Sequence, residues 1–482
     1  MSDLELKPAA ARASKGVIWS AADFWTQQTS QILTFILVGN MLGPGPVGVM
    51  TMGLVTILFV AAFIEQGFSD ALIQRPQLED THFDTTFWLM LGLGVLGGAA
   101  LWATAPAIAV VFSEPQLADI LPPMAAALPC IAVAECYTAM IRRRLMFRQL
   151  AIRSILAYGS GFATALIMAR LGYGIDSLVA FFLVSRILSA LLVIAVSRSL
   201  PGLKLSRRAF RDITGFGKHR VAQHVVAYLS LQSPRIIIGI FLGPVVLGLY
   251  SMAERLVAAL NNGISGVLQR VAFPVLSSHQ SDRSSFDRVM RDFLTFSNLI
   301  ALPVFMGIAV TSDRLIEVLL EPSWAPMSIV LQILCAAALA GPTNYILMAA
   351  TNALGRADLV LRLSLVSAAI RVPAVLAAAQ IDVVATAGTI VAISFLSVPM
   401  FMLWVNRLFA RRWFRLMGGV WAPLGATALM TAVVLTVSPQ LSSLTPVAGL
   451  ACQVAVGVVT YAIAIGLMAS KTCRRMARVF AG

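Results

Sequence analysis

Three arginines lie deep inside long apolar stretches of the sequence. Arg186 and Arg371 stand near the middle of their apolar runs, and Arg255 stands well inside another. In a bilayer each such charge costs at least ~2.5 kcal/mol unless it meets water or a partner. Because a guanidinium group binds phosphate oxygens in bidentate geometry, these positions predict an anion-binding site, with Arg235 as a fourth candidate. Structural ion pairs are the alternative. The acids considered for them are Glu65, Glu135 and Glu254.

Polar side chains recur at helical spacing in two of the apolar runs. They are Asp23, Gln27 and Gln31 in the first run, and Glu254, Asn261 and Asn262 in a later one. Residues three, four or seven apart share one face of a helix, and a polar face in a membrane must look into protein or water. We expect these faces to line a hydrated cavity. Hydrogen bonding between helices is the alternative.

The residues that catalysis would need are not grouped in any known pattern. The sequence has no nucleophile–base pairing, no glycine-rich phosphate loop, and no metal-ligand spacing among its 4 histidines and 5 cysteines. We therefore expect a protein that is not an enzyme, with no catalytic residues, no metal and no cofactor.

The elements that must position these side chains are membrane-spanning helices. The 482 residues are 59% hydrophobic and 12% charged, whereas soluble domains are about 25% charged. Runs of about 20 apolar residues can cross the hydrocarbon layer as helices. The sequence predicts an all-α polytopic membrane protein with about 14 transmembrane helices. Their expected ranges are 17–42, 46–68, 86–112, 117–141, 150–171, 174–197, 219–242, 245–274, 292–312, 326–350, 359–380, 383–406, 416–437 and 447–469.

The positive charges are concentrated in alternate loops, and the other loops offer little beyond Arg170 and Arg314. Examples are Arg142 to Arg144, the segment 198–218, Arg411 and Arg412, and Arg474 and Arg475. Lys and Arg in short loops mark the cytoplasmic side, so both termini are expected in the cytoplasm. The formal net charge of +14 is then a signal of topology and does not indicate a nucleic-acid partner.

A segment of the sequence is repeated 200 residues further on. ILVGNMLGPGPVGVMTM (36–52) aligns with IIIGIFLGPVVLGLYSM (236–252), including a shared Leu-Gly-Pro turn. Six helices separate the copies, so both enter the membrane in the same direction, as in transporters built from parallel repeats. The expected parts are an N-terminal lobe (1–198), a basic cytoplasmic linker (199–218), a C-terminal lobe (219–410), and two further helices with a basic tail (411–482).

Several stretches resemble one family. They are FIEQGFSDALIQRP (63–76), RRRLMFRQLAI (142–152), GIFLGPVVLGLYSMAERL (239–256), RVAFPVLSS (270–278) and ATNALGRADL (350–359). In order and spacing they are similar to Wzx-type polysaccharide exporters and lipid-linked-oligosaccharide flippases of the multidrug/oligosaccharidyl-lipid/polysaccharide superfamily, in the branch of colanic-acid exporters.

The resemblance implies two six-helix lobes that face a central cavity and open it alternately to either side. It implies an undecaprenyl-diphosphate-linked glycan as cargo and the bacterial inner membrane as location. Membrane lipids are expected partners, together with a polysaccharide polymerase and glycosyltransferases of the same pathway. A multidrug/cation antiporter of the same superfamily is the alternative, followed by a membrane polysaccharide polymerase or ligase.

The charge pattern predicts the topology of the chain. Reporter fusions at positions 145, 208, 411 and 478 should report the cytoplasm, and fusions at 114, 319 and 442 should report the periplasm. Paired alkaline phosphatase and green fluorescent protein fusions measure both outcomes. A reversal within the first twelve helices would contradict the parallel repeat, since the repeat requires its two copies to share one orientation.

Overall fold

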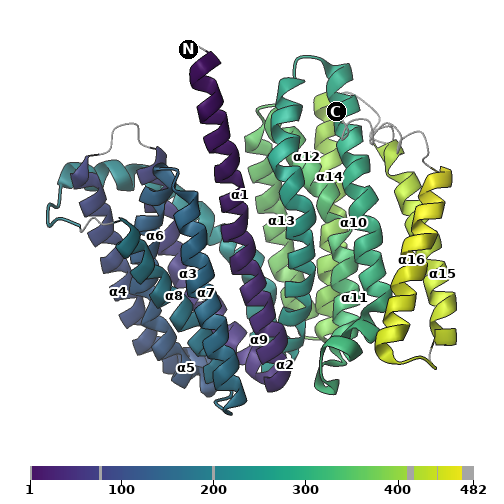
Figure 1. Cartoon of the computed structure of the whole chain (residues 1–482), viewed down its shortest axis with the longest axis horizontal. Helices are drawn as coiled ribbons and strands as arrows, with labels where there is room; N and C mark the ends of the chain where they lie inside the picture. Colours follow the sequence, from purple (N-terminus) through teal and green to yellow (C-terminus); the bar gives the residue numbers. More distant parts are fainter. Residues whose placement is uncertain (1–2, 75–78, 198–200, 410–416, 442, 469–482) are drawn as a thin grey trace. The chain divides into compact units, whose positions relative to one another are not determined.

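The computed structural model describes residues 3–74, 79–197, 201–409, 417–441 and 443–468. All regular structure in these ranges is helical (Figure 1). Within them, 12 helices are long and apolar enough to cross a membrane. The prediction of an all-α polytopic membrane protein is confirmed. The chain divides into two compact units, unit 1 (Met1–Gly248) and unit 2 (Leu249–Gly482).

Unit 1 contains eight helices, a π-helical turn and the first part of α9. The helices are α1 (Asp3–Leu33), α2 (Gly39–Leu42), α3 (Pro44–Gln74), α4 (Asp80–Val111), α5 (Gln116–Ala125), α6 (Ala127–Arg143), α7 (Phe147–Arg170) and α8 (Asp176–Ser197), with the π-turn at Thr34–Val38 and α9 at Arg207–Ser278. α7 packs against both α1 and α8, and α6 packs against α3 and α4.

Unit 2 contains the rest of α9 and seven further helices. They are α10 (Arg283–Leu319), α11 (Met327–Ala338), α12 (Gly341–Ala353), α13 (Ala357–Ala378), α14 (Val383–Phe409), α15 (Trp421–Val437) and α16 (Pro446–Met468). Its core contains Phe286, Met290 and Leu294 of α10 and Ile346 and Leu347 of α12. α15 and α16 pack on α10, where the Tyr461 hydroxyl donates to the Leu299 carbonyl at 2.7 Å.

Fourteen expected spans correspond to twelve candidate spans for two reasons. The first expected span is α1 with the π-turn and α2, which together run from Asp3 to Leu42 and are not among the twelve. The expected helices 219–242 and 245–274 both lie within α9, where the backbone leaves helical geometry at Gly243. The expected ranges thus correspond to all twelve candidate spans, two of them joined within α9, whereas the helical residues 3–16 and 207–218 lie outside the expected ranges.

Three predicted helices differ from the observed ones in their bounds or their continuity. The expected helix 117–141 corresponds to the candidate span Gln116–Arg143, which a turn at Ala126 divides into α5 and α6. Pro122 and Pro123 lie within α5, where they have no backbone N–H to donate. The expected helix 326–350 is divided in the same way into α11 and α12, with Pro342 at the start of the second piece. α10 begins at Arg283 rather than 292, since Asp282 caps it by accepting from the Ser284 N–H at 2.9 Å.

The repeated Leu-Gly-Pro turns have the same backbone conformation. Gly43 has φ 80° and ψ 176°, and Gly243 has φ 79° and ψ 179°. This region of backbone space is essentially restricted to glycine. A bond from an N–H to the carbonyl five residues earlier closes the turns after α4, α6, α7 and α12. After α6 the Met146 N–H donates to the Ile141 carbonyl at 3.1 Å, and after α12 the Arg356 N–H donates to the Thr351 carbonyl at 3.2 Å.

The two Leu-Gly-Pro turns also contact each other, and both lie in unit 1. A Cβ atom built on Gly48 would stand 1.7 Å from the Pro244 carbonyl oxygen, and one built on Gly248 would stand 1.9 Å from the Pro44 carbonyl oxygen. In each turn the proline carbonyl oxygen therefore contacts the glycine of the other copy. The contact is reciprocal, and neither glycine position has room for a side chain.

Replacing either contact glycine should destabilise the fold. Gly48→Ala or Gly248→Ala forces a methyl group onto a carbonyl oxygen, and overpacking of this kind costs about 1–3 kcal/mol. Gly92→Ala is the matched control, since a Cβ there meets nothing within 4 Å. Thermal unfolding of the purified protein, followed by size-exclusion fluorescence, measures the effect. Equal stability of the three variants would show that the two backbones do not touch.

Candidate functional site

A polar network joins α1 to α7 inside unit 1. Ser154 donates to Asp23 Oδ1, and Gln27 Nε2 donates to Asp23 Oδ1 at 3.0 Å and to Ser154 Oγ at 3.3 Å. Arg153 Nη2 lies 3.5 Å from Asp23 Oδ1, while its Nη1 donates to Thr138 Oγ1 of α6 at 2.9 Å. The network places one carboxylate and one guanidinium group between three apolar helices.

The Asp23–Arg153 ion pair is largely removed from solvent. The exposed fraction of the side chain is 8% for Arg153 and 13% for Asp23. A pair at this depth needs further hydrogen bonds to offset desolvation, and Ser154 and Thr138 supply them. Arg148 makes a further contact between α7 and α1. Its guanidinium group lies over the Trp19 ring at 5.8 Å from the ring centroid.

Sequence reasoning missed Arg153. It follows Arg148 by five residues in the run RQLAIRSIL, and we grouped the arginines of this region with the interfacial charges. The signal available was its place beyond the first turn of an apolar helix, where a cation requires a partner. The identity of that partner follows only from the packing of α1 on α7. Asp23 and Gln27 were predicted as cavity lining, and their contacts in the structure are between helices.

Gln31, the third predicted residue of α1, is half-buried and precedes a change in helix type. At Thr34–Val38 the bonding pattern widens to that of a π-helix, and the Thr34 hydroxyl donates to the Ser30 carbonyl at 2.7 Å. Single π-helical turns are frequent at functional positions in helices. Nothing in the sequence pattern indicated this turn.

The two predicted arginines of unit 1 are half-buried and contact side chains on their own helices. The Arg186 guanidinium lies over the Phe182 ring of α8 at 5.6 Å from its centroid. Arg235 Nη1 donates to Gln232 Oε1 of α9 at 2.9 Å. Such contacts orient a guanidinium group.

In unit 2 one face of α9 carries polar groups between apolar neighbours. Tyr250, Glu254 and Asn261 are four and seven residues apart and share this face. Tyr250 is buried, Glu254 and Asn261 are half-buried, and the adjacent Asn262 is exposed. A Cβ built on Gly341 of α12 would stand 3.4 Å from Asn261 Oδ1, so this face of α9 approaches α12.

Arg371 of α13 is half-buried and lies within electrostatic range of Tyr250. Its buried Nε atom has no hydrogen-bond partner in the part of the chain that the structure describes. Arg255, one residue beyond Glu254 on α9, is also half-buried. An orphaned donor on a buried guanidinium group is unfavourable, and an incoming acceptor would satisfy it.

The predicted residues are distributed over both units. Arg186, Arg235 and the three α1 residues belong to unit 1, and Arg255, Arg371 and the polar face of α9 belong to unit 2. Convergence of Arg186, Arg255 and Arg371 on one cavity stays a prediction. Glu65 is one of the acids considered as ion-pair partners, and its side chain lies outside the part of the chain that the structure describes.

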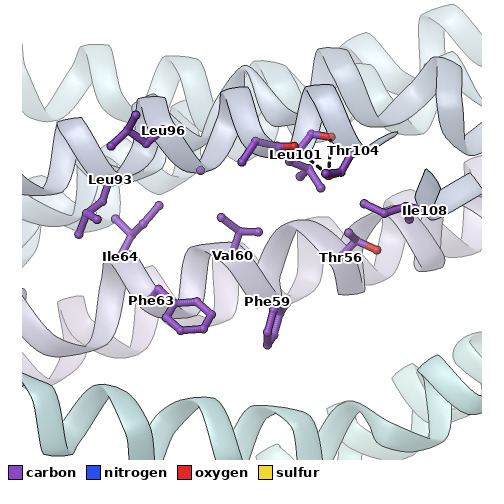
Figure 2. A pocket seen from close by; sticks show the side chains of 12 residues that line it. Thr56, Phe59, Val60, Phe63, Ile64, Leu93, Leu96, Leu101, Thr104 and Ile108 are labelled. Carbon is purple, nitrogen blue, oxygen red and sulfur yellow. Dashed lines mark hydrogen bonds between the residues drawn. The ribbon is translucent and has the colours of Figure 1, made fainter. Parts of the chain in front are cut away.

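Unit 1 also has an apolar groove of about 570 Å³ between α3 and α4 (Figure 2). It is lined by Thr56, Phe59, Val60, Phe63, Ile64, Leu93, Leu96, Gly97, Ala100, Leu101, Thr104 and Ile108. Both threonine hydroxyls donate to carbonyls of their own helices, Thr56 to Met52 at 2.9 Å and Thr104 to Ala100 at 2.8 Å. The groove therefore offers hydrocarbon contacts and no site for a phosphate or a sugar.

Known proteins share the sequence family and the fold. Residues 37–329 match the family described as polysaccharide biosynthesis protein. ExoT of Rhizobium meliloti (strain 1021), a succinoglycan biosynthesis transport protein, is 24% identical over 65% of this chain and 63% of its own length. The chain thus spans less than two thirds of that relative. WzxC of Escherichia coli (strain K12), a lipopolysaccharide biosynthesis protein, is 23% identical over 69% of this chain and 68% of its own.

Two solved structures have the same helical architecture. The lipid II flippase MurJ in an inward closed conformation aligns with a TM-score of 0.73, covering 94% of this chain and 98% of its own at 13% identity. An inward-facing multidrug resistance transporter of the MATE family aligns with a TM-score of 0.65, covering 81% of this chain and 98% of its own at 15% identity. At these identities the likeness concerns the fold alone.

Breaking the α1–α7 ion pair should destabilise the protein. Arg153→Leu leaves the Asp23 carboxylate buried without its cation, and loss of one partner of a buried pair costs about 3–5 kcal/mol. The double variant Asp23→Asn/Arg153→Leu should recover part of this loss, because no charge remains. Arg170→Leu, which replaces an exposed arginine in the last turn of the same helix, is the control. A thermal-shift measurement in detergent gives the melting temperature of each variant. Equal melting temperatures for Arg153→Leu and the control would show that the ion pair does not hold the two helices together.

Proposed function

Because the chain belongs to the polysaccharide biosynthesis protein family, we propose that it carries undecaprenyl-diphosphate-linked oligosaccharide repeat units across the bacterial inner membrane. The transport proceeds by alternating access of the cavity to the two sides. The names of relatives support a transport role, since ExoT is a transport protein of succinoglycan biosynthesis and MurJ is a lipid II flippase. The resulting product is exopolysaccharide or lipopolysaccharide.

One observation carries the proposal, namely the unsatisfied guanidinium nitrogen of Arg371. A cation in the middle of a membrane-spanning helix requires an anion or water. The diphosphate of a lipid-linked glycan supplies oxygens in the geometry that a guanidinium group prefers. Arg186 and Arg255 occupy comparable depths in their helices, so we propose that they share this duty and that Arg235 assists them.

The polar faces provide for the glycan. Asn261, Asn262 and Glu254 on α9 offer donors and acceptors of the kind that sugar hydroxyls bind. The polyprenyl tail of the cargo can stay in lipid during transport, so that only the headgroup crosses the protein. We place both termini in the cytoplasm, assign the driving force to an ion gradient, and propose that the chain performs no covalent chemistry.

A cation antiporter is the second candidate, because the MATE transporters share the fold. The arginines of the proposed site argue against a cationic drug, since like charges repel in a low-dielectric cavity. Ligand-induced thermal stabilisation separates the two functions. Stabilisation by a lipid-linked oligosaccharide supports the flippase, whereas stabilisation only by cationic drugs supports the antiporter.

Substitution of the proposed anion ligands should abolish export. Arg371→Leu should abolish export of the glycan while the protein still inserts and folds, and Arg371→Lys should restore only part, because lysine has the charge without the planar fork. Arg186→Leu and Arg255→Leu should behave alike. Arg362→Leu is the matched control, an exposed arginine on the same helix as Arg371. Normal export by all three leucine variants in a complementation assay would refute the site.

A further inference from the structure

The segment that connects α8 to α9 exposes leucines next to arginines. The exposed fraction is 84% for Leu203 and 70% for Leu205, and Phe210 is exposed as well. The exposed cations of this segment are Lys204, Arg207, Arg208 and Arg211. Large apolar side chains that stand this far out are unfavourable in water. A surface with interleaved leucines and cations is typical of elements that lie in the headgroup region of a bilayer.

The segment is fixed in place by the first turns of α4. The Gly202 N–H donates to Asp84 Oδ1 at 2.8 Å, and the Trp88 indole N–H donates to the Gly202 carbonyl at 2.8 Å. The Ser206 N–H donates to Thr85 Oγ1 at 3.1 Å. Asp84 is only 6% exposed, so the bond that it accepts from Gly202 is largely shielded from water. We call the five residues that form these bonds, Asp84, Thr85, Trp88, Gly202 and Ser206, the linker clamp.

The linker clamp sets the depth of the leucines in the membrane. With 32 residues, α4 is about 48 Å long at 1.5 Å per residue, longer than the hydrocarbon layer of about 30 Å. Its first turns, which contain Asp84 and Trp88, therefore reach the headgroup region. Tryptophan side chains collect at this level, where headgroups meet hydrocarbon. The leucines next to Gly202 are therefore held at the boundary between the two regions.

We infer that residues 201–211 form an interfacial anchor that binds anionic phospholipid headgroups. Leu203 and Leu205 enter the outermost hydrocarbon, and the cations contact the phosphates above it. Two exposed acids, Glu79 and Asp80, stand at the start of α4, and the four cations outnumber them. The charge rule for topology requires only that cations lie on one side of the membrane. The anchor adds a rigid placement and apolar contacts, and it is independent of which cargo the protein carries.

Native mass spectrometry of the full-length protein tests this anchor with phosphatidylglycerol and phosphatidylcholine as probes. Arg207→Gln/Arg208→Gln should bind phosphatidylglycerol roughly 30-fold more weakly, given the contribution of each cation near an anionic surface. Leu203→Ser/Leu205→Ser should also weaken it, although no charge changes. Trp88→Phe should weaken it by releasing Gly202. The matched control, Arg283→Gln/Arg288→Gln, removes two exposed arginines at the start of α10 and should leave binding unchanged.

Three results would overturn the anchor. One is phosphatidylglycerol binding that is unaffected in the arginine variant, as expected if the segment binds a soluble protein instead. Another is an equal loss in the control, which would indicate a general effect of net charge. The third is weaker phosphatidylglycerol binding by the arginine variant but not by the leucine or Trp88 variants. This result would show that neither the leucine contacts nor the fixed depth contributes to lipid binding. Retained phosphatidylcholine binding and a single size-exclusion peak show that each variant is folded.

Discussion

Backbone hydrogen bonding in a medium without water is the constraint on which this structure depends. In hydrocarbon each N–H and C=O group needs a partner within the protein, so every departure from the helix must be satisfied locally. The break between α5 and α6 meets this requirement with a bond from the Ala126 N–H to the Pro122 carbonyl at 3.3 Å. The break before α12 does so with a bond from the Asn344 N–H to the Ala340 carbonyl at 3.0 Å. The helices can therefore change direction without exposing backbone to lipid.

The same constraint places polar side chains between helices. Arg153, Asp23 and Ser154 form bonds with one another in unit 1, and through them α1 is held on α7. In unit 2 the buried Asn298 donates to Thr343 Oγ1 at 3.1 Å and so joins α10 to α12. Arg371 and Arg153 each have a buried Nε with no hydrogen-bond partner among the described residues, but Arg153 also pairs with Asp23 through its Nη2. That ion pair makes Arg153 part of the helix packing, whereas Arg371 is a residue that we propose as a ligand of the cargo.

Much of the fold was predictable from the sequence because membrane helices are defined by length and apolarity. The expected helix 150–171 corresponds to α7 (Phe147–Arg170), whose apolar run is bounded by arginines. Hydropathy does not report the polar turns that extend a helix beyond the membrane, so α10 was predicted too short. The Asp23–Arg153 pair joins residues far apart in the chain, and neither residue indicates which helix the other one meets. The π-turn at Thr34–Val38 lies in a run of ordinary apolar residues, TFILV, and has no distinctive composition.

The position of the candidate residues within the helices followed from the sequence, but their contacts did not. The spacing of Asp23 and Gln27 correctly placed both on one face of α1. Whether that face of α1 meets a cavity or another helix depends on how closely the neighbouring helices pack. Small residues permit the closest packing. Gly16 is an example, since a Cβ there would stand 3.0 Å from the Phe147 ring of α7. Such distances are set by packing and have no counterpart in the residue pattern.

The reciprocal contact of Gly48 with Pro244 and of Gly248 with Pro44 has the form of an isologous interface. In a dimer with two-fold symmetry, residue i of one subunit meets residue j of the other, and j meets i. Here both halves of that relation occur in a single polypeptide, so the contact is the one that two half-length chains would make as a homodimer. In such a dimer, a substitution at one position of the sequence would alter both contacts at once. In this single chain, a substitution at Gly48 or at Gly248 alters one contact directly and leaves the residues of the other unchanged.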